Sequence, residues 1–121
     1  MSARLYVLKD LKVWNKAMEI TEKVYRLSAN FPREERYGLT SQIRRCAVSV
    51  PSNIAEGAGR NTNGEFKNFL SIANGSAYEL FTQLILSYKL KLVPKEDVEY
   101  ILKEIIEVQK MNYALIKLLN K

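Results

Sequence analysis

Apolar residues recur every three or four positions in four successive segments of this 121-residue chain. That spacing places them on one face of a helix, whereas a strand requires alternation with a period of two, which the sequence does not sustain over more than a few residues. The connections between the segments are short, so consecutive helices are expected to run antiparallel. The sequence therefore predicts an all-α fold, an antiparallel up-and-down four-helix bundle that forms a single domain over residues 1–121.

The first helix is predicted to begin with Asp10 as its N-cap, which leaves residues 1–9 as a short N-terminal extension. It is predicted to end at Phe31-Pro32, because the residue before a proline avoids helical backbone angles. Two further residues, Ala17 and Val24, widen the stripe that is expected to face inward. That stripe consists of Leu11, Trp14, Met18, Thr21, Tyr25 and Ser28.

The second helix is predicted to bury Leu39, Ile43, Ala47, Val50 and Ile54. Its proline, Pro51, removes an amide that would otherwise bond to a backbone carbonyl one turn earlier, so we expect a kink near Val50. Gly57 and Gly59 are expected to end the helix, since glycine is tolerated at the left-handed position that follows many helices.

The third helix has a capping box, in which Thr62 is followed three residues later by Glu65. Gly75, inside this helix, costs stability relative to alanine, and we interpret it as a mark of close approach by another helix. The fourth helix is predicted to carry Pro94 in its first turn, with acidic residues Glu96 and Asp97 near the positive end of the helix dipole.

The third and fourth helices carry more apolar surface than one bundle core can bury. The second half of the third helix is apolar on nearly every side, and the fourth has two adjacent apolar stripes where one would suffice. We interpret the surplus as an oligomer interface. Its candidate residues are Tyr78, Phe81, Ile85, Leu102, Ile106 and Tyr113.

The composition argues against an enzyme. The chain has no histidine and a single cysteine, Cys46, which is predicted to be a buried or half-buried thiol. These counts exclude an intrachain disulfide, a thiolate metal cluster and the Glu-x-x-His pairs of di-iron bundles. Glu56 remains an alternative general base, but we interpret it and Glu79 as salt-bridge partners. We expect no catalytic residue, no metal and no cofactor.

The net charge of +6, with its excess in the first half of the chain, is compatible with contact to phosphate backbones or acidic partners. Tyr6 and Tyr37 could add base stacking from loops, while Trp14 and Tyr25 are assigned to the core. A competing interpretation makes Arg44 and Arg45 ion-pair partners of the glutamates named above. The candidate nucleic-acid-binding residues are Arg33, Arg36, Arg44, Arg45, Arg60, Lys12 and Lys16.

No run reaches the eighteen or more apolar residues of a membrane span, and the N-terminus lacks the apolar region of a signal peptide. We therefore expect a cytoplasmic protein that does not contact a membrane.

Several motifs together resemble a known family. They are FP at residues 31–32, YGL at 37–39, QIRR at 42–45, PSNIAEG at 51–57 and FKNFLSIANGSAYEL at 66–80. The chain resembles the 23S rRNA-intervening-sequence family of bacterial four-helix-bundle proteins, many of which have no established function. The family is related to accessory variability proteins of diversity-generating retroelements, so the resemblance implies a homopentamer that binds nucleic acid and a reverse transcriptase. The positions matching its motif include Asn53, Glu56 and Gly57, with a role in packing or in binding.

Two functional hypotheses follow. In the first, a non-enzymatic homo-oligomer, expected to be a pentamer, binds RNA or DNA through its basic surface without reading the sequence. In the second, the same assembly docks a protein such as a reverse transcriptase or other polymerase, and its positive charge only steers the encounter.

Overall fold

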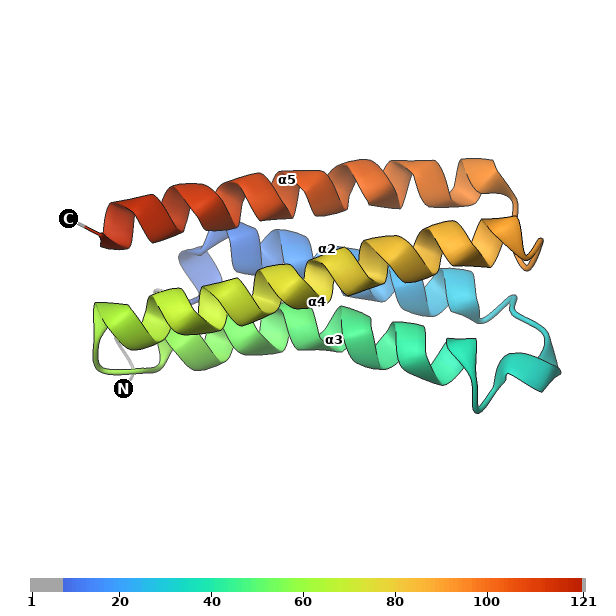
Figure 1. Ribbon diagram of the computed structural model, residues 1–121, viewed down its shortest axis with the longest axis horizontal. Coiled ribbons are helices and arrows are strands. Elements are labelled where there is room, and N and C mark those ends of the chain that lie inside the picture. Colours follow the sequence, from blue (N-terminus) through green and yellow to red (C-terminus); the bar gives the residue numbers. More distant parts are fainter. Residues whose placement is uncertain (1–7, 121) are drawn as a thin grey trace.

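The computed structural model describes residues 8–120, and over that range the chain folds into helices without strands. Its four long helices are α2 (Lys12–Ser28), α3 (Leu39–Ala58), α4 (Asn63–Lys89) and α5 (Lys95–Leu119), and a short 3₁₀ helix, η1 (Arg33–Glu35), lies between α2 and α3. Figure 1 shows the connections at alternating ends of an elongated bundle. The predicted all-α bundle is confirmed.

Each long helix packs against two others, in the cyclic order α2, α3, α4, α5 and back to α2. The space between them is filled by one cluster of aliphatic side chains, because a helix with a single apolar stripe must bury it against a neighbour. Leucine, isoleucine and valine contribute the largest side chains that are almost fully buried. They are Ile43, Ile54, Leu70, Leu80, Leu84, Ile105, Val24, Val98 and Val108.

The predicted inward face of α2 is right only in part, since Ala17, Val24 and Ser28 are buried as expected, and the helix starts after Leu11 rather than Asp10. Met18 and Tyr25, assigned to the core, are 41% and 42% exposed. The two competing stripes differ mainly in side-chain type, and the stripe of wholly aliphatic residues is buried because a tyrosine keeps its hydroxyl near water. The buried apolar residues are Val13, Ala17, Ile20, Val24 and Leu27.

The predicted inward face of α3 is confirmed, since all five of its residues are buried. Pro51 lies inside this helix, which is helical on both sides of it. The helix ends at Gly59 as predicted, but the predicted left-handed conformation is wrong, because Gly59 has a φ of −82°. The Gly59 amide instead donates to the Ala55 carbonyl at 3.1 Å, which continues the right-handed turn.

The predicted roles of two glycines are also corrected. A Cβ at Gly75 would meet nothing within 4 Å, so this exposed residue does not mark a close helix approach within the chain. The close approach occurs at Gly57, where a Cβ would lie 2.7 Å from the Phe69 Cβ and 3.2 Å from the Phe66 carbonyl oxygen. Gly57 thus sets how near α3 comes to α4.

The predicted start of α4 is confirmed, and that of α5 is wrong by one position. The Glu65 amide donates to the Thr62 hydroxyl at 3.2 Å, so Thr62 is the N-cap of α4. Pro94 precedes the first residue of α5, and Glu96 and Asp97 lie in its first turn. Within residues 8–120, no helix is both long enough and apolar enough to cross a membrane.

A polar pair interrupts the apolar core where α4 faces α5. Asn112 is 0% exposed and Asn74 is 5% exposed, and the Asn112 Nδ2 atom donates to the Asn74 Oδ1 atom at 2.7 Å. A buried amide needs such a partner, because its transfer from water without one costs free energy. The two helices are therefore joined by a hydrogen bond inside the core.

Candidate nucleic-acid interface

Two of the candidate arginines project from the same side of the turn between α2 and α3. This turn is tight, with the Glu35 amide donating to the Pro32 carbonyl at 2.9 Å and the Arg36 amide to the Arg33 carbonyl at 3.0 Å. In 3₁₀ geometry, side chains three positions apart lie one above the other. Arg33 and Arg36 have that separation, so both guanidinium groups can reach one ligand.

A pocket of about 380 Å³ lies beside this turn, and we name it the arginine pocket. Among the residues that the structure describes, its lining contains three arginines and no carboxylate. The nearby Glu35 carboxylate accepts a hydrogen bond from the Leu39 amide at 3.1 Å and so is held at the start of α3. The lining residues are Ser28, Ala29, Phe31, Pro32, Arg33, Arg36, Thr40 and Arg44.

Arg44 is held in place by the end of α2. Its Nε donates to the Ser28 hydroxyl at 2.7 Å and its Nη2 to the Tyr25 carbonyl at 3.0 Å. Its guanidinium also lies over the Tyr25 ring, 4.6 Å from the centroid. An arginine has five N–H donors, so these contacts fix the group and leave donors for a ligand. Within residues 8–120, neither Arg44 nor Arg45 forms an ion pair with Glu56 or Glu79, which corrects that interpretation.

Two arginines of the arginine pocket each contact a tyrosine ring. The Tyr37 side chain is 89% exposed, and the Arg36 guanidinium lies 5.7 Å from its ring centroid. The Tyr25 ring, which the sequence assigned to the core, is half exposed and stacks on Arg44. Trp14 does pack against the core, and Tyr6 lies outside the described residues. Neither tyrosine lines the pocket itself, but each adjoins it through one of the pocket's arginines.

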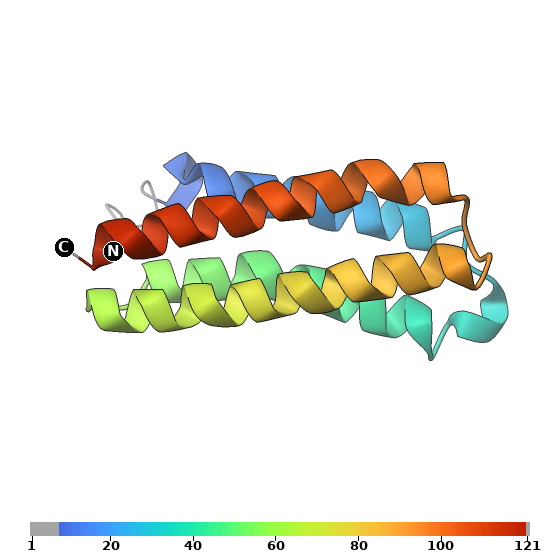
Figure 2. The same ribbon diagram turned by 45° about the horizontal axis from the view of Figure 1, so that its top comes forward.

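The other candidate basic residues lie away from this pocket. Lys12 begins α2, and Arg60 follows α3, so both are at the opposite end of the bundle, where α3 joins α4 (Figures 1 and 2). Arg60 lies 3.9 Å from the Glu56 carboxylate and 3.8 Å from that of Glu65. Arg45 lines a separate groove of about 290 Å³ between α3 and α4, which it shares with Glu79.

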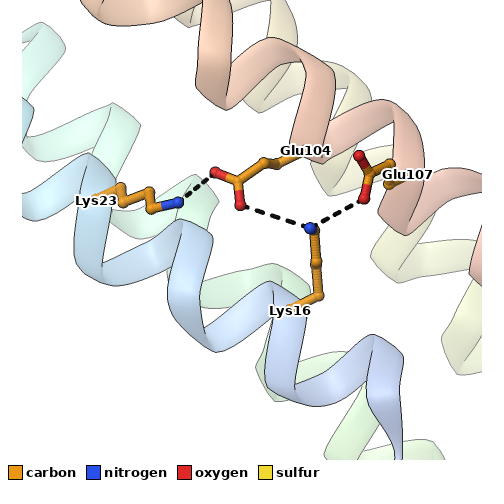
Figure 3. A network of polar contacts seen from close by, with 4 residues as sticks. All are labelled: Lys16, Lys23, Glu104 and Glu107. Carbon is orange, nitrogen blue, oxygen red and sulfur yellow. Dashed lines mark hydrogen bonds and ion pairs between the residues drawn. The ribbon is translucent and has the colours of Figure 1, made fainter.

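Lys16 belongs to an ion-pair network that the sequence did not predict. Glu104 on α5 has a side chain only 4% exposed, and it lies between the ammonium groups of Lys23 at 2.7 Å and Lys16 at 3.6 Å (Figure 3). Lys16 also contacts Glu107 at 2.9 Å, and this hydrogen bond raises the pKa of Lys16 above its usual value. The charge of Lys16 is therefore balanced within the chain.

Most of the chain matches one protein family. The sequence profile described as 23S rRNA-intervening sequence protein matches residues 9–114. The chain belongs to this family. No curated protein matches it.

A solved structure shares the fold of this chain. It is a protein of unknown function from the S23 ribosomal protein family of Bacteroides thetaiotaomicron. The two sequences are 26% identical, the match covers 87% of this chain and 95% of the other, and the TM-score is 0.80. The similarity therefore extends over nearly the whole bundle.

Each of the three motif residues has a contact within the chain. The Asn53 amide donates to the Ser49 hydroxyl at 3.0 Å, and that hydroxyl lies 2.8 Å from the Ser76 hydroxyl on α4. Glu56 forms an ion pair with Arg60, and the absence of a side chain at Gly57 allows α4 to pack closely against α3. Asn53 and Gly57 thus lie along the α3–α4 contact, while Glu56 pairs with a residue just past the end of α3, and all three are at a distance from the arginine pocket along α3.

The candidate oligomer residues lie on α4 and α5, two helices that contact each other. Three of them are exposed in the single chain: Tyr78 by 55%, Tyr113 by 53% and Ile106 by 40%. The other three, Phe81, Ile85 and Leu102, are partly buried. We name these six residues the α4–α5 apolar face.

The single thiol is predicted to be unreactive at neutral pH. Cys46 is buried and donates to the Ser76 carbonyl at 3.1 Å, and burial together with the nearby Glu79 carboxylate raises its pKa from 9.0 to about 12. We expect a disulfide reagent at pH 8 to modify it far more slowly in the folded protein than in denaturant, because the thiolate is the nucleophile.

The raised pKa of Cys46 also makes the stability of the fold depend on pH. Above pH 9 the unfolded thiol ionises while the folded one keeps its proton, so stability falls with pH towards about 12. The slope from this group should reach at most about 1.4 kcal/mol per pH unit and should be missing in Cys46→Ala. Equal slopes in the two proteins, measured by chemical denaturation, would contradict this assignment.

Proposed function

We propose that this chain is a homo-oligomeric bundle protein that binds RNA or DNA without reading the sequence, and that the arginine pocket is the contact site. The observation that carries the proposal is the convergence of Arg33, Arg36 and Arg44 on one pocket with no carboxylate among its described lining residues. A guanidinium matches the geometry of phosphate oxygens and can bind them in a bidentate manner.

Sequence independence is supported by the kind of groups that the pocket offers. Its polar lining consists of guanidinium groups, the Thr40 hydroxyl and the Ser28 hydroxyl that already bonds to Arg44. The guanidinium groups and the Thr40 hydroxyl suit phosphate and sugar oxygens. Reading a sequence would require an element that enters a groove and reaches base edges. The pocket instead lies at the short turn between α2 and α3, which presents no long helix or strand that could enter a groove.

Self-association would strengthen such binding. The α4–α5 apolar face lies on two helices other than α2 and α3, which supply the pocket arginines, so copies that associate through this face could leave each arginine pocket open. Several linked sites bind a polymer more tightly than one site, since later contacts are intramolecular. The resemblance to retroelement accessory proteins implies a pentamer, and that is the assembly we propose.

The exposed tyrosines of the α4–α5 apolar face also support a second function, a protein-docking module. Exposed aromatic and aliphatic residues gathered on one face are typical of protein interfaces. In that case the protein docks a partner such as a reverse transcriptase or other polymerase, and the basic end steers the encounter.

Replacing Arg33 and Arg36 together with alanine is expected to weaken nucleic-acid binding uniformly across sequences. It should also reduce the slope of log affinity against log salt by about one, because the two arginines together neutralise one phosphate in the complex. Fluorescence anisotropy of labelled RNA and DNA at several salt concentrations measures both quantities. Both side chains are exposed, so the variant should keep the helix content and the oligomeric state of the parent protein.

The matched control is Lys12→Ala combined with Arg45→Ala, which removes the same charge from two exposed residues outside the arginine pocket. We expect this control to bind nearly as well as the parent. An equal loss of affinity in both variants would show that net charge, and not the pocket, determines binding. If the parent protein binds no nucleic acid at low salt, the nucleic-acid proposal is wrong and the protein-docking function is the one favoured.

A further inference from the structure

We infer that the arginine pocket prefers unpaired nucleic acid over duplex, with a phosphate between the arginines and the adjacent base stacked on Tyr37. This inference rests on the proposed function and names the form of nucleic acid that the site accepts.

The shape of the site favours a flexible strand. The pocket is an open surface hollow of about 380 Å³, and its arginines come from both the turn and α3. A double helix presents phosphates on a stiff, convex surface, whereas a single strand can bend one phosphate into a hollow and expose the neighbouring base.

The Tyr37 ring is placed to receive that base. Arg36 both lines the pocket and lies over this ring, so the ring adjoins the phosphate position. With 89% of the side chain exposed, the ring offers a face to solvent that no core contact explains. Stacking on an aromatic ring is tolerant of base identity, because every base has a π-face, and it is available only to bases outside a duplex stack.

Arg44 supplies the fixed wall of the site. Two hydrogen bonds to the end of α2 and the Tyr25 ring hold its guanidinium before any ligand arrives. A donor that is already oriented loses little side-chain entropy on binding. The pocket therefore combines a preorganised arginine with two arginines on an exposed turn, next to one open aromatic face.

The test compares a labelled single strand of about sixteen nucleotides with the blunt duplex of the same sequence, both titrated with the full-length protein at one low salt concentration. We expect tighter binding of the single strand. Tyr37→Ala should lower affinity for the single strand roughly 5- to 100-fold and leave duplex affinity nearly unchanged. Tyr37→Phe keeps the ring and should bind as the parent does.

The outcomes separate this inference from the proposed function. Equal affinity for both forms, or a preference for the single strand that survives Tyr37→Ala, overturns the inference while phosphate binding stands. Loss of affinity for both forms in Tyr37→Ala also overturns it, because the ring then serves the pocket and not a base. Absence of binding to either form overturns both proposals.

Discussion

Replacing Lys16 and Lys23 together with methionine is expected to lower the free energy of unfolding by about 3–5 kcal/mol. The Glu104 carboxylate is only 4% exposed, and these two ammonium groups, at 3.6 and 2.7 Å, are its charged partners (Figure 3). Methionine preserves most of the apolar side chain, so the destabilisation comes chiefly from a buried charge left without compensation. Chemical denaturation followed by circular dichroism measures it.

Two further variants show whether the buried carboxylate causes that destabilisation. Adding Glu104→Gln to the double variant removes the charge and should recover most of the stability. Lys103→Met with Lys110→Met, at two exposed positions of α5, makes the same change in net charge and should cost little. A triple variant as unstable as the double one would mean that the lysine side chains stabilise the fold by packing and not by charge.

Gly57→Ala is expected to destabilise the protein by about 3 kcal/mol, the upper end of the usual cost of overpacking. The added Cβ would lie 2.7 Å from the Phe69 Cβ and 3.2 Å from the Phe66 carbonyl oxygen. Neither atom is the far end of a flexible side chain, so α4 itself must move away from α3. Thermal and chemical denaturation of the variant should both report the lower stability.

Gly75→Ala is the matched control, since it makes the same change in the neighbouring helix at a site with nothing within 4 Å. Alanine is the better helix former, so this variant should gain up to about 1 kcal/mol. Opposite signs for the two variants are therefore expected. A similar response at both glycines would contradict the close contact between α3 and α4.

The sequence predicted the fold well wherever one stripe was clearly the most apolar. In α3 the aliphatic residues from Leu39 to Ile54 have no competing stripe, and all were placed correctly. In α2 two stripes compete, and spacing alone did not show that Val13 is buried while Tyr25 is half exposed. The glycines were misinterpreted for another reason, since the distance between two helices is a tertiary property that local sequence does not contain.

The site was predictable in part. The sequence identified arginines as the relevant residues, but the order of seven basic residues along a chain carries no information about which of them meet. Folding brings Arg33, Arg36 and Arg44 to one pocket and balances the charge of Lys16 within the chain. The buried Glu104 was missed because its partners lie on α2, far away in sequence, and a glutamate in an amphipathic helix is usually exposed.

The amide pair between α4 and α5 determines which alignment of these two long helices the chain can adopt. Aliphatic side chains are nearly interchangeable, so sliding α5 by one turn, about 5.4 Å, would still bury hydrocarbon against hydrocarbon. Such a slip would separate Asn112 from Asn74 and break the hydrogen bond between them. Each buried group that loses its partner would cost about 1–3 kcal/mol. A single hydrogen bond in the core thus selects one register out of several that would bury the apolar faces of α4 and α5 equally well.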